Sequence, residues 1–435
     1  MKNRSVHYLF IVLLTTITIA ACTSPKVEAP DAENLHSVNI ALEKDIVHDF
    51  FSPPVASRIY LYPNLISYEI ISQKHTDYVS LKTILPDFPN IPRYEGKQHE
   101  IASLYSFLLV AKELVYTTNH IETEIKQLDE KFATIDDLDA IKSYSKQATA
   151  SIREWLQKDN YPETRNMQGY TLLEKEGSWT PTPPDYMDAL EPHWEKIRYV
   201  TLDSANQFTP IAPTKYDLTK GSDFHKELIE VYEAVNTKTD STEAIAKFWD
   251  CNPIISRQEG HITYSEKKLT PGGHWMNICR LASRKEIHTF EEVAYSYTSL
   301  SIGIFDAFIS CWQTKYATHY IRPVTVIQNE IDPGWFPILS TPNFPEYTSG
   351  HSVVSRVAAT LLTYRFGENY SFTDTTEVPF GMPPRSFSSF IHASDEAAIS
   401  RFYGGIHFKP AIYQGIKQGD KVGKHVLTAV KKLKK

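Results

Sequence analysis

Three short motifs late in the chain hold the cationic, hydroxyl and imidazole side chains that could do chemistry. In sequence order, these motifs are Lys315 with Arg322-Pro323, then Ser349-Gly350-His351, and finally Ser400-Arg401 with His407. Three cations, a hydroxyl group and two histidines are suited to binding a tetrahedral oxyanion and to chemistry at its central atom. We interpret the rest of the chain as the scaffold that brings these motifs together.

The first motif predicts two cations on one side of a helix end. Lys315 and Arg322 are seven residues apart, which is two helical turns, so both side chains can project from one face. Pro323 disfavours the helical conformation at Arg322 and predicts that the helix ends there. Taken alone, the pair is better explained as two solvated cations on a helix surface.

The second motif stands directly before an apolar segment with helical periodicity. A helix N-terminus presents free N–H groups and the positive end of the helix dipole, so an oxyanion is stabilised there. Gly350 lets the backbone approach a ligand closely, and Ser349 adds a hydroxyl group. The alternative is a helix N-cap at Ser349 followed by an incidental histidine at position 351.

The third motif is interrupted by two glycines. Gly404 and Gly405 favour a kink between Arg401 and His407, so both side chains can face one pocket. A single histidine is more often a structural residue than a ligand, but the ordered combination changes this judgement. By chance, all three motifs occur together in roughly fewer than one in a thousand chains.

The combined pattern resembles a known superfamily. Lys-x6-Arg-Pro, Ser-Gly-His and Ser-Arg-x5-His are similar to the motifs that unite vanadium-dependent haloperoxidases with type 2 phosphatidic acid phosphatases and bacterial acid phosphatases, and the chain resembles the bacterial haloperoxidase-like lipoprotein branch. The resemblance spans about residues 312–411. It implies that His407 is the covalent ligand of vanadate or the phosphoryl-accepting nucleophile, and that His351 is the general acid/base. It implies that the oxyanion is held by Lys315, Arg322, Ser349, Gly350 and Arg401.

Two aromatic residues favour the haloperoxidase branch. Trp312 and Phe344 are similar to the aromatics beside vanadate in chloride-oxidising members, which implies a halide pocket, although both residue types are usually core. The implied activity is oxidation of halide by hydrogen peroxide at vanadate on His407. One alternative is a cofactor-free acid phosphatase that hydrolyses phosphomonoesters through phosphorylated His407. Another is a non-catalytic oxyanion-binding protein.

Two positions depart from the family pattern. Thr348 stands where Pro commonly precedes Ser-Gly-His, and Ala411 stands where the longer motif usually has Asp. That missing Asp would orient His407 by a hydrogen bond. We expect Asp306 or another acid to take this role, or else a weakened activity.

Helical periodicity dominates the chain and predicts an all-α fold of packed helical bundles. No segment has a convincing strand pattern, and 160–220 is expected to be a long irregular connection. For 270–275 we prefer a turn at Gly272-Gly273 over a role for His274 at the site entrance. An N-terminal helical region is expected over 35–220, and a C-terminal catalytic region over 221–435. Helices are predicted over 42–50, 99–132, 135–158, 224–235, 241–249, 285–320, 351–366, 393–403 and 411–434.

Composition limits the partners of the protein. The chain has 435 residues, 42% of them hydrophobic, and a formal net charge of −7 with no basic patch interleaved with aromatics, which argues against nucleic-acid binding. The expected partners are instead small molecules, either peroxide and halide or a phosphomonoester. The spacings of Cys251, Cys279 and Cys311 fit no zinc ligand set, so we expect buried free thiols and at most one disulfide.

The N-terminus has the composition of a targeting segment. Lys2 and Arg4 precede an apolar stretch, Tyr8 to Ile19, that is too short to span a bilayer comfortably. Small residues then precede Cys22, which resembles a bacterial lipoprotein signal with lipidation of Cys22; an ordinary secretory signal is the alternative. Residues 1–21 would be the signal peptide and 22–34 a tether. The expected location is extracytoplasmic, in the periplasm or at the cell surface, with the lipid as the only membrane contact.

Overall fold

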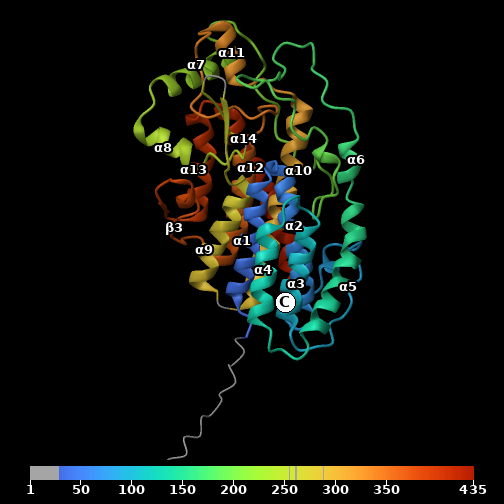
Figure 1. Cartoon of the computed structure of the whole chain (residues 1–435). Coiled ribbons are helices and arrows are strands. Elements are labelled where there is room, and N and C mark those ends of the chain that lie inside the picture. The colour runs from blue at the N-terminus through green and yellow to red at the C-terminus, as the bar shows by residue number, and fades with distance from the viewer. Residues whose placement is uncertain (1–28, 254, 260–261, 288) are drawn as a thin grey trace, which may run out of the picture.

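The computed structural model describes residues 29–435 except 254, 260–261 and 288. The predicted signal peptide, Cys22 and most of the predicted tether lie outside the described residues. Figure 1 shows an elongated molecule in which long helices form the lower half, while α7, α8 and α11 lie near the top. The helices of the described part are α1 Ala32–His48, α2 Pro53–Ser72, α3 His99–Lys112, α4 Asn119–Lys131, α5 Leu138–Gln157, α6 Tyr161–Arg165, α7 Asp223–Asn236, α8 Asp240–Phe248, α9 Pro271–Glu286, α10 Phe290–Thr318, α11 Pro323–Glu330, α12 Gly350–Phe366, α13 Phe390–Tyr403 and α14 Lys409–Val430.

The prediction of an all-α fold is confirmed, with two small β-hairpins as the exception. Strand β1 (Ile255–Glu259) pairs antiparallel with β2 (Ile262–Glu266), and β3 (Phe372–Asp374) pairs antiparallel with β4 (Arg385–Phe387). These strands contradict the expectation of no strand. They are three to five residues long, which is too short for an alternating pattern to stand out in the sequence.

Helix α10 is the centre of the molecule and belongs to both helical regions. It is 29 residues long and buried on every side, packing against α2 on one side and α12 on the other. Gly303 lets α12 approach closely, because a Cβ atom there would overlap Leu361. One hydrophobic core extends from Leu35 to Leu433, so the two predicted regions share their interior.

The first two helices differ from the prediction. α1 begins at Ala32, within the segment predicted to be a tether, because Asp31 and Asn34 form a reciprocal capping box there. α2 was not predicted at all. Residues 54–71 of this helix are buried continuously, so no polar stripe marks its period, and Pro63 inside it argued against a helix.

The prediction of one helix over 99–132 is wrong, because α3 and α4 are separate helices. The carboxylate of Asp49 accepts hydrogen bonds from the backbone N–H groups of Tyr116 and Thr117, at 2.8 and 2.7 Å. Asp45 accepts from the N–H groups of His120 and Ile121 at 3.3 and 3.1 Å. These two acids of the α1 region satisfy the free amides before and at the start of α4, so the break depends on contacts distant in sequence.

Segment 270–275 does not form the expected turn. Thr270 caps α9 by accepting from the N–H of Gly273, so both glycines lie in the first helical turn. His274 is fully buried and therefore does not line an entrance. Helix α11 likewise forms directly after Arg322, in a stretch for which no helix is predicted.

The other expectations agree with the structure. α5, α7, α8, α10, α12, α13 and α14 lie where helices were predicted, apart from a few residues at their ends, and the connection 160–220 is largely irregular. Gly367 ends α12 with a φ of 106°. Cys251, Cys279 and Cys311 are buried free thiols. Within the described residues, no helix combines the length and apolarity that a membrane crossing requires.

Candidate active site

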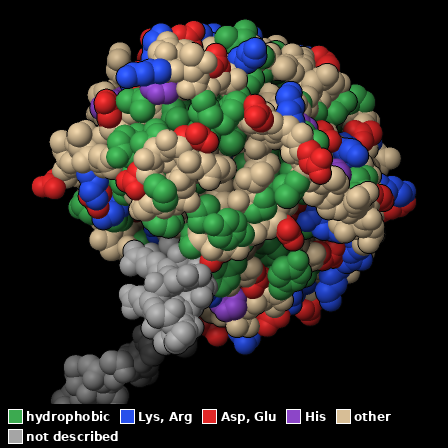
Figure 2. All heavy atoms as spheres, turned by 90° about the horizontal axis from the view of Figure 1, so that it is seen from above, with side chains coloured by type: hydrophobic (Ala, Val, Ile, Leu, Met, Phe, Trp, Pro, Cys, Tyr) green, Lys and Arg blue, Asp and Glu red, His purple; other side chains and the backbone are tan. Residues whose placement is uncertain are grey.

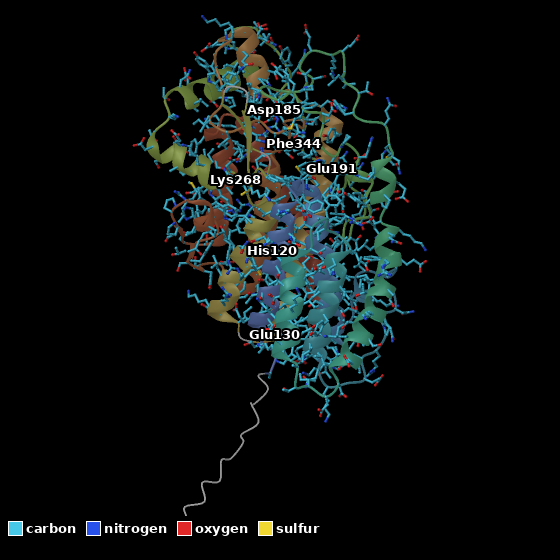
Figure 3. All side chains as sticks on the ribbon, viewed as in Figure 1. His120, Glu130, Asp185, Glu191, Lys268 and Phe344 are labelled. Carbon is cyan, nitrogen blue, oxygen red and sulfur yellow. The ribbon has the colours of Figure 1, made fainter. Side chains whose placement is uncertain are left out.

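The ends of several helices meet at one cavity in the upper half of the molecule. Phe344, labelled in Figure 3, lies there, far from Glu130 at the lower end. The C-terminal part of α10, the loop before α12, the N-terminus of α12 and the segment from α13 to α14 supply the functional side chains. The walls include Met187, Cys251, Trp312, Phe344, Gly350, His351, Arg401 and His407.

His407 is held between an acid and a cation. Its Nδ1 lies 2.8 Å from Oε1 of Glu346, and its Nε2 lies 3.2 Å from Nη1 of Arg322. Because the carboxyl oxygen accepts the Nδ1–H proton, the lone pair is on Nε2. Burial, reinforced by the charge of Arg322, holds the pKa of His407 well below its usual value. The imidazole is therefore a neutral ligand with a directed lone pair.

Glu346 takes the orienting role of the acid that is missing at position 411. Its Oε1 also accepts from the backbone N–H of Phe408 at 2.9 Å, and burial raises its pKa to about 8 against the opposing charge of Arg322. Asp306 does not take this role, since its carboxylate accepts from the backbone N–H groups of Val200 and Thr201. The sequence left open Asp306, another acid or a weakened activity, and the acid that contacts His407 is Glu346, not Asp306.

The two arginines are almost completely buried and keep donors free for a ligand. Arg322 donates from Nε to the carbonyl of Phe344 at 2.9 Å and from Nη1 to that of Ile406 at 2.8 Å. Arg401 donates from Nη1 to the carbonyl of Trp249 at 3.0 Å. Nη2 of Arg322 and Nε of Arg401 are buried without a hydrogen-bond partner among the described residues. A bound anion would satisfy both donors.

Lys315 has its three donors in use. Its Nζ lies 2.9, 3.0 and 2.5 Å from the carbonyl oxygens of Pro345, Glu346 and Thr348. Burial lowers its pKa to about 7. In this arrangement Lys315 holds the loop before Ser349 by its carbonyl groups. To contact an oxyanion directly, Nζ of Lys315 would have to give up one of these three carbonyl hydrogen bonds.

The N-terminus of α12 faces the cavity as the motif predicted. Ser349 is the N-cap, its hydroxyl oxygen accepting from the N–H of Ser352 at 3.4 Å, which leaves the hydroxyl proton available. A Cβ atom on Gly350 would meet only Trp312, at 3.6 Å, so the space before this backbone is open. His351 bonds the backbone of Trp249, and its Nε2 is buried without a described partner. Burial and then Arg401 hold its pKa well below the usual value, so the ring is a proton acceptor.

Two aromatic rings form the wall beside these cations. The ring centroids of Trp312 and Phe344 lie 4.9 Å apart, and Phe344 also lies 4.9 Å from Nζ of Lys315 and 5.1 Å from Cζ of Arg322. The ring faces stabilise the buried positive charges. Both residues thus contact the predicted site, as the motif context had indicated.

Two contributors were missed in the sequence. Glu346 was not singled out, although a lone acid among prolines and aromatics three residues before Ser349 was a usable signal. The carbonyl of Trp249, which bonds Arg401 and also contacts His351, could not be found, because a backbone atom leaves no trace in residue type.

The residues present fit vanadate, an oxyanion with several oxygens around one metal centre. The lone pair on His407 would be its ligand, the free donors on Arg322 and Arg401 would bind its oxygens, and the unpartnered Nε2 of His351 would accept a proton beside it. Vanadate held there would supply the activation of hydrogen peroxide for the oxidation of halide. Acidic and basic side chains are interspersed on the upper face of the described chain rather than gathered into a basic patch, as Figure 2 shows.

Comparisons with known proteins agree with this geometry. Residues 296–435 match a family described as the VCPO second helical-bundle domain. No curated protein sequence matched the chain significantly. Among solved structures, a bacterial vanadium-dependent iodoperoxidase is similar with 44% identity and a TM-score of 0.87, covering 93% of this chain and 98% of that protein.

A more distant structure shares the fold. The holo form of a bacterial vanadium-dependent chloroperoxidase has 15% identity and a TM-score of 0.71, covering 94% of this chain and 98% of that protein. The full-length similarity at 44% identity settles the family assignment, and the hydrogen bond that orients His407 on Glu346 agrees with it. This chain belongs to the vanadium-dependent haloperoxidase family, whose members are oxidoreductases with vanadate as cofactor.

Proposed function

We propose that the protein is a vanadate-dependent peroxidase that oxidises iodide with hydrogen peroxide. The observation that carries this proposal is His407, whose Nδ1 is engaged by Glu346 and whose Nε2 lone pair lies beside Arg322. This arrangement supports ligation of an oxyanion at Nε2. Because Glu346 supplies an acid that orients His407, the absence of Asp at position 411 is no longer a reason to expect an inactive site.

The surrounding residues have separate roles in this proposal. Arg322, Arg401 and the Gly350 N–H bind the oxyanion oxygens and neutralise their charge, while Ser349 donates its hydroxyl proton. His351 accepts a proton from peroxide on its unpartnered Nε2 and returns it later, because its depressed pKa keeps it neutral beforehand.

The apolar wall supports iodide as the halide. Trp312 and Phe344 line the cavity with apolar rings that offer few hydrogen bonds, so the ion must shed much of its hydration shell. Iodide is the largest of the three oxidisable halides and the least strongly hydrated, so its desolvation costs least. The similar bacterial structure is also that of an iodoperoxidase.

The test is a paired assay on purified protein that lacks residues 1–22. Iodide, bromide and chloride oxidation by peroxide are each measured before and after addition of vanadate, and hydrolysis of a generic phosphomonoester is measured in parallel. We expect vanadate-dependent oxidation that is fastest with iodide. Phosphomonoester hydrolysis that vanadate inhibits would contradict the proposal and support the phosphatase alternative.

We also propose that the protein is tethered outside the cytoplasm to a bacterial membrane through lipidated Cys22. The support is the sequence alone, where a basic start, a short apolar stretch and small residues precede this cysteine. Incorporation of a labelled fatty acid into the full chain, and its loss in Cys22→Ser, is the expected result. Incorporation into the variant equal to that of the full chain would refute the anchor.

A further inference from the structure

Beside the active-site cavity lies a cluster of three buried side chains that the peroxidase chemistry does not use. Cys251 follows α8, His274 lies in the first turns of α9, and Glu377 follows β3. Their exposed fractions are 1%, 0% and 3%. A thiol, an imidazole and a carboxylate from three separate segments thus meet in the interior.

The donor atoms of this cluster face one another. Sγ of Cys251 lies 3.4 Å from Nδ1 of His274, and Oε1 of Glu377 lies 3.1 Å from the same nitrogen. All three donor atoms lie within 4.8 Å of one another. A tetrahedral zinc ion, with Zn–S of about 2.3 Å and Zn–N and Zn–O near 2.05 Å, separates sulfur from nitrogen by roughly 3.6 Å and nitrogen from oxygen by roughly 3.3 Å. The spacing of the donors is therefore close to that of a zinc site.

The other side of the imidazole is held as in histidines that ligate metals. Nε2 of His274 lies 2.7 Å from Oδ2 of Asp374 and 2.8 Å from Oγ1 of Thr376, so Nε2 keeps its proton, and Nδ1, which would carry the lone pair toward a bound metal, faces Cys251 and Glu377. Asp374 is itself fixed by the N–H of Thr376 at 2.9 Å. Trp249 stacks on the ring face at 4.6 Å and so leaves the ring plane, where a metal would sit, open.

Glu377 gives a further indication that a cation belongs here. Its Oε1 is buried and, apart from the 3.1 Å contact with Nδ1 of His274, makes no hydrogen bond within the described part of the chain. A buried carboxylate oxygen without a hydrogen bond is costly, and a cation at this point would satisfy it. The competing arrangement is a metal-free imidazolium held between Asp374 and Glu377.

We propose that Cys251, His274 and Glu377 bind a zinc ion, with Asp374 orienting the histidine and a water completing the tetrahedron. A thiolate and a carboxylate together cancel the two charges of the ion, which suits a buried site. The mixture of sulfur, nitrogen and oxygen donors selects zinc over magnesium or calcium, which prefer oxygen alone. The spacing of the cysteines gave no hint of it, because only one cysteine takes part.

The site would stabilise the wall of the vanadate cavity. The chain passes directly from Trp249, whose carbonyl accepts from Arg401, through Asp250 to Cys251. Asp250 lies 4.0 Å from Arg401 and 2.9 Å from Lys268, which is labelled in Figure 3. A zinc ion on Cys251 would therefore fix the segment that positions one of the oxyanion-binding arginines.

The experiment measures metal in the full-length protein after chelator treatment, exposure to Zn²⁺ and removal of free ions. Elemental analysis should find about one zinc per chain in the wild type. Cys251→Ser and Glu377→Gln should each lower zinc affinity by more than about tenfold. Cys279→Ala is the matched control, since Cys279 is an equally buried thiol in α9 away from the cluster, and it should retain zinc.

A second measurement does not depend on any variant folding. Loading the wild-type protein with Co²⁺ should give the thiolate-to-cobalt absorption band of a tetrahedral site with sulfur ligation, and added Zn²⁺ should remove it. Wild-type protein that binds no zinc, cobalt without this band, or zinc retained equally by Cys251→Ser and Glu377→Gln would each overturn the proposal. The outcome is separate from iodide oxidation, because neither readout requires vanadate.

Discussion

Replacing Glu346 by Gln tests the central claim about the vanadate ligand. The glutamine oxygen can still accept from Nδ1 of His407 and from the N–H of Phe408, so packing and hydrogen bonds are kept. What changes is charge. Because the pKa of Glu346 is raised to about 8, its carboxyl group is protonated at lower pH, where glutamine resembles it, and ionised at higher pH, where glutamine does not.

The size of the effect follows from the role of a hydrogen-bond partner behind a metal ligand. Complete loss of such a partner costs about 10- to 100-fold in affinity, or roughly 1.4–2.7 kcal/mol, and this is an upper limit for glutamine, which keeps the hydrogen bond and removes only the charge. The ratio of vanadate dissociation constants, variant over wild type, should therefore be near one at about pH 6.5 and rise at about pH 9 to at most about 10–100. Taking the ratio removes the changes in vanadate protonation, because they affect both proteins equally.

Stability should respond in the opposite direction. The folded-state pKa of Glu346 lies above its ordinary value of 4.5, so the protonated carboxyl stabilises the fold at low pH and this contribution is lost as pH rises through about 8. Glutamine stays neutral throughout. The thermal midpoint of the vanadate-free variant should consequently fall less between about pH 6.5 and pH 9 than that of the wild type.

Asp306→Asn is the matched control for this experiment. Asp306 is also fully buried and accepts from two backbone N–H groups, at 2.8 Å each, but it does not contact His407. Its substitution should lower the thermal midpoint and leave vanadate affinity unchanged. The reasoning is refuted if the Glu346→Gln ratio stays constant across this pH range, or if Asp306→Asn weakens vanadate binding equally.

Three further outcomes are expected. His351→Ala should abolish halide oxidation while vanadate binding persists, because this ring moves protons and is not the ligand. Isothermal titration with vanadate measures the binding, and a turnover assay measures the activity. Turnover that survives in the variant would contradict the role of His351. Phe344→Ala should raise the KM for iodide more than it lowers kcat, because it removes part of the cavity wall that would contact the halide. Steady-state kinetics with iodide measure both constants. An unchanged KM would argue against a halide pocket beside Phe344. Asp45→Ala should lower the free energy of unfolding by about 2–4 kcal/mol, because it leaves amides at the start of α4 without acceptors. Denaturant unfolding measures the loss, and Asp139→Ala, at an exposed position, is the near-neutral control. Equal losses in the two variants would refute the capping role of Asp45.

The local parts of the site could be predicted from the sequence. Ser349 caps α12, Gly350 opens its first turn, and Arg322 is extended before Pro323 with φ −88° and ψ 148°. Each of these features depends on neighbours within a few residues, which a motif contains. The same holds for amphipathic helices such as α5, whose apolar stripe faces a neighbour.

The remaining features depend on contacts between distant residues. α2 is buried on all sides and loses its period, and the break between α3 and α4 depends on acids about seventy residues earlier. The choice of Glu346 over Asp306 as partner of His407 is likewise decided only by which acid the fold brings within reach. The motif alone indicated that an acid should orient His407, but it did not identify which acid.

The cavity wall also sets a limit on how long the protein can work. Met187 borders the space in which hypohalous acid would be formed. A thioether is among the protein groups most readily oxidised, in this case to the sulfoxide. Each turnover therefore releases its product next to an oxidisable wall residue, and the number of cycles before self-inactivation depends on how fast the product escapes. The residues that line this cavity therefore determine the working lifetime of the protein as well as its catalytic rate.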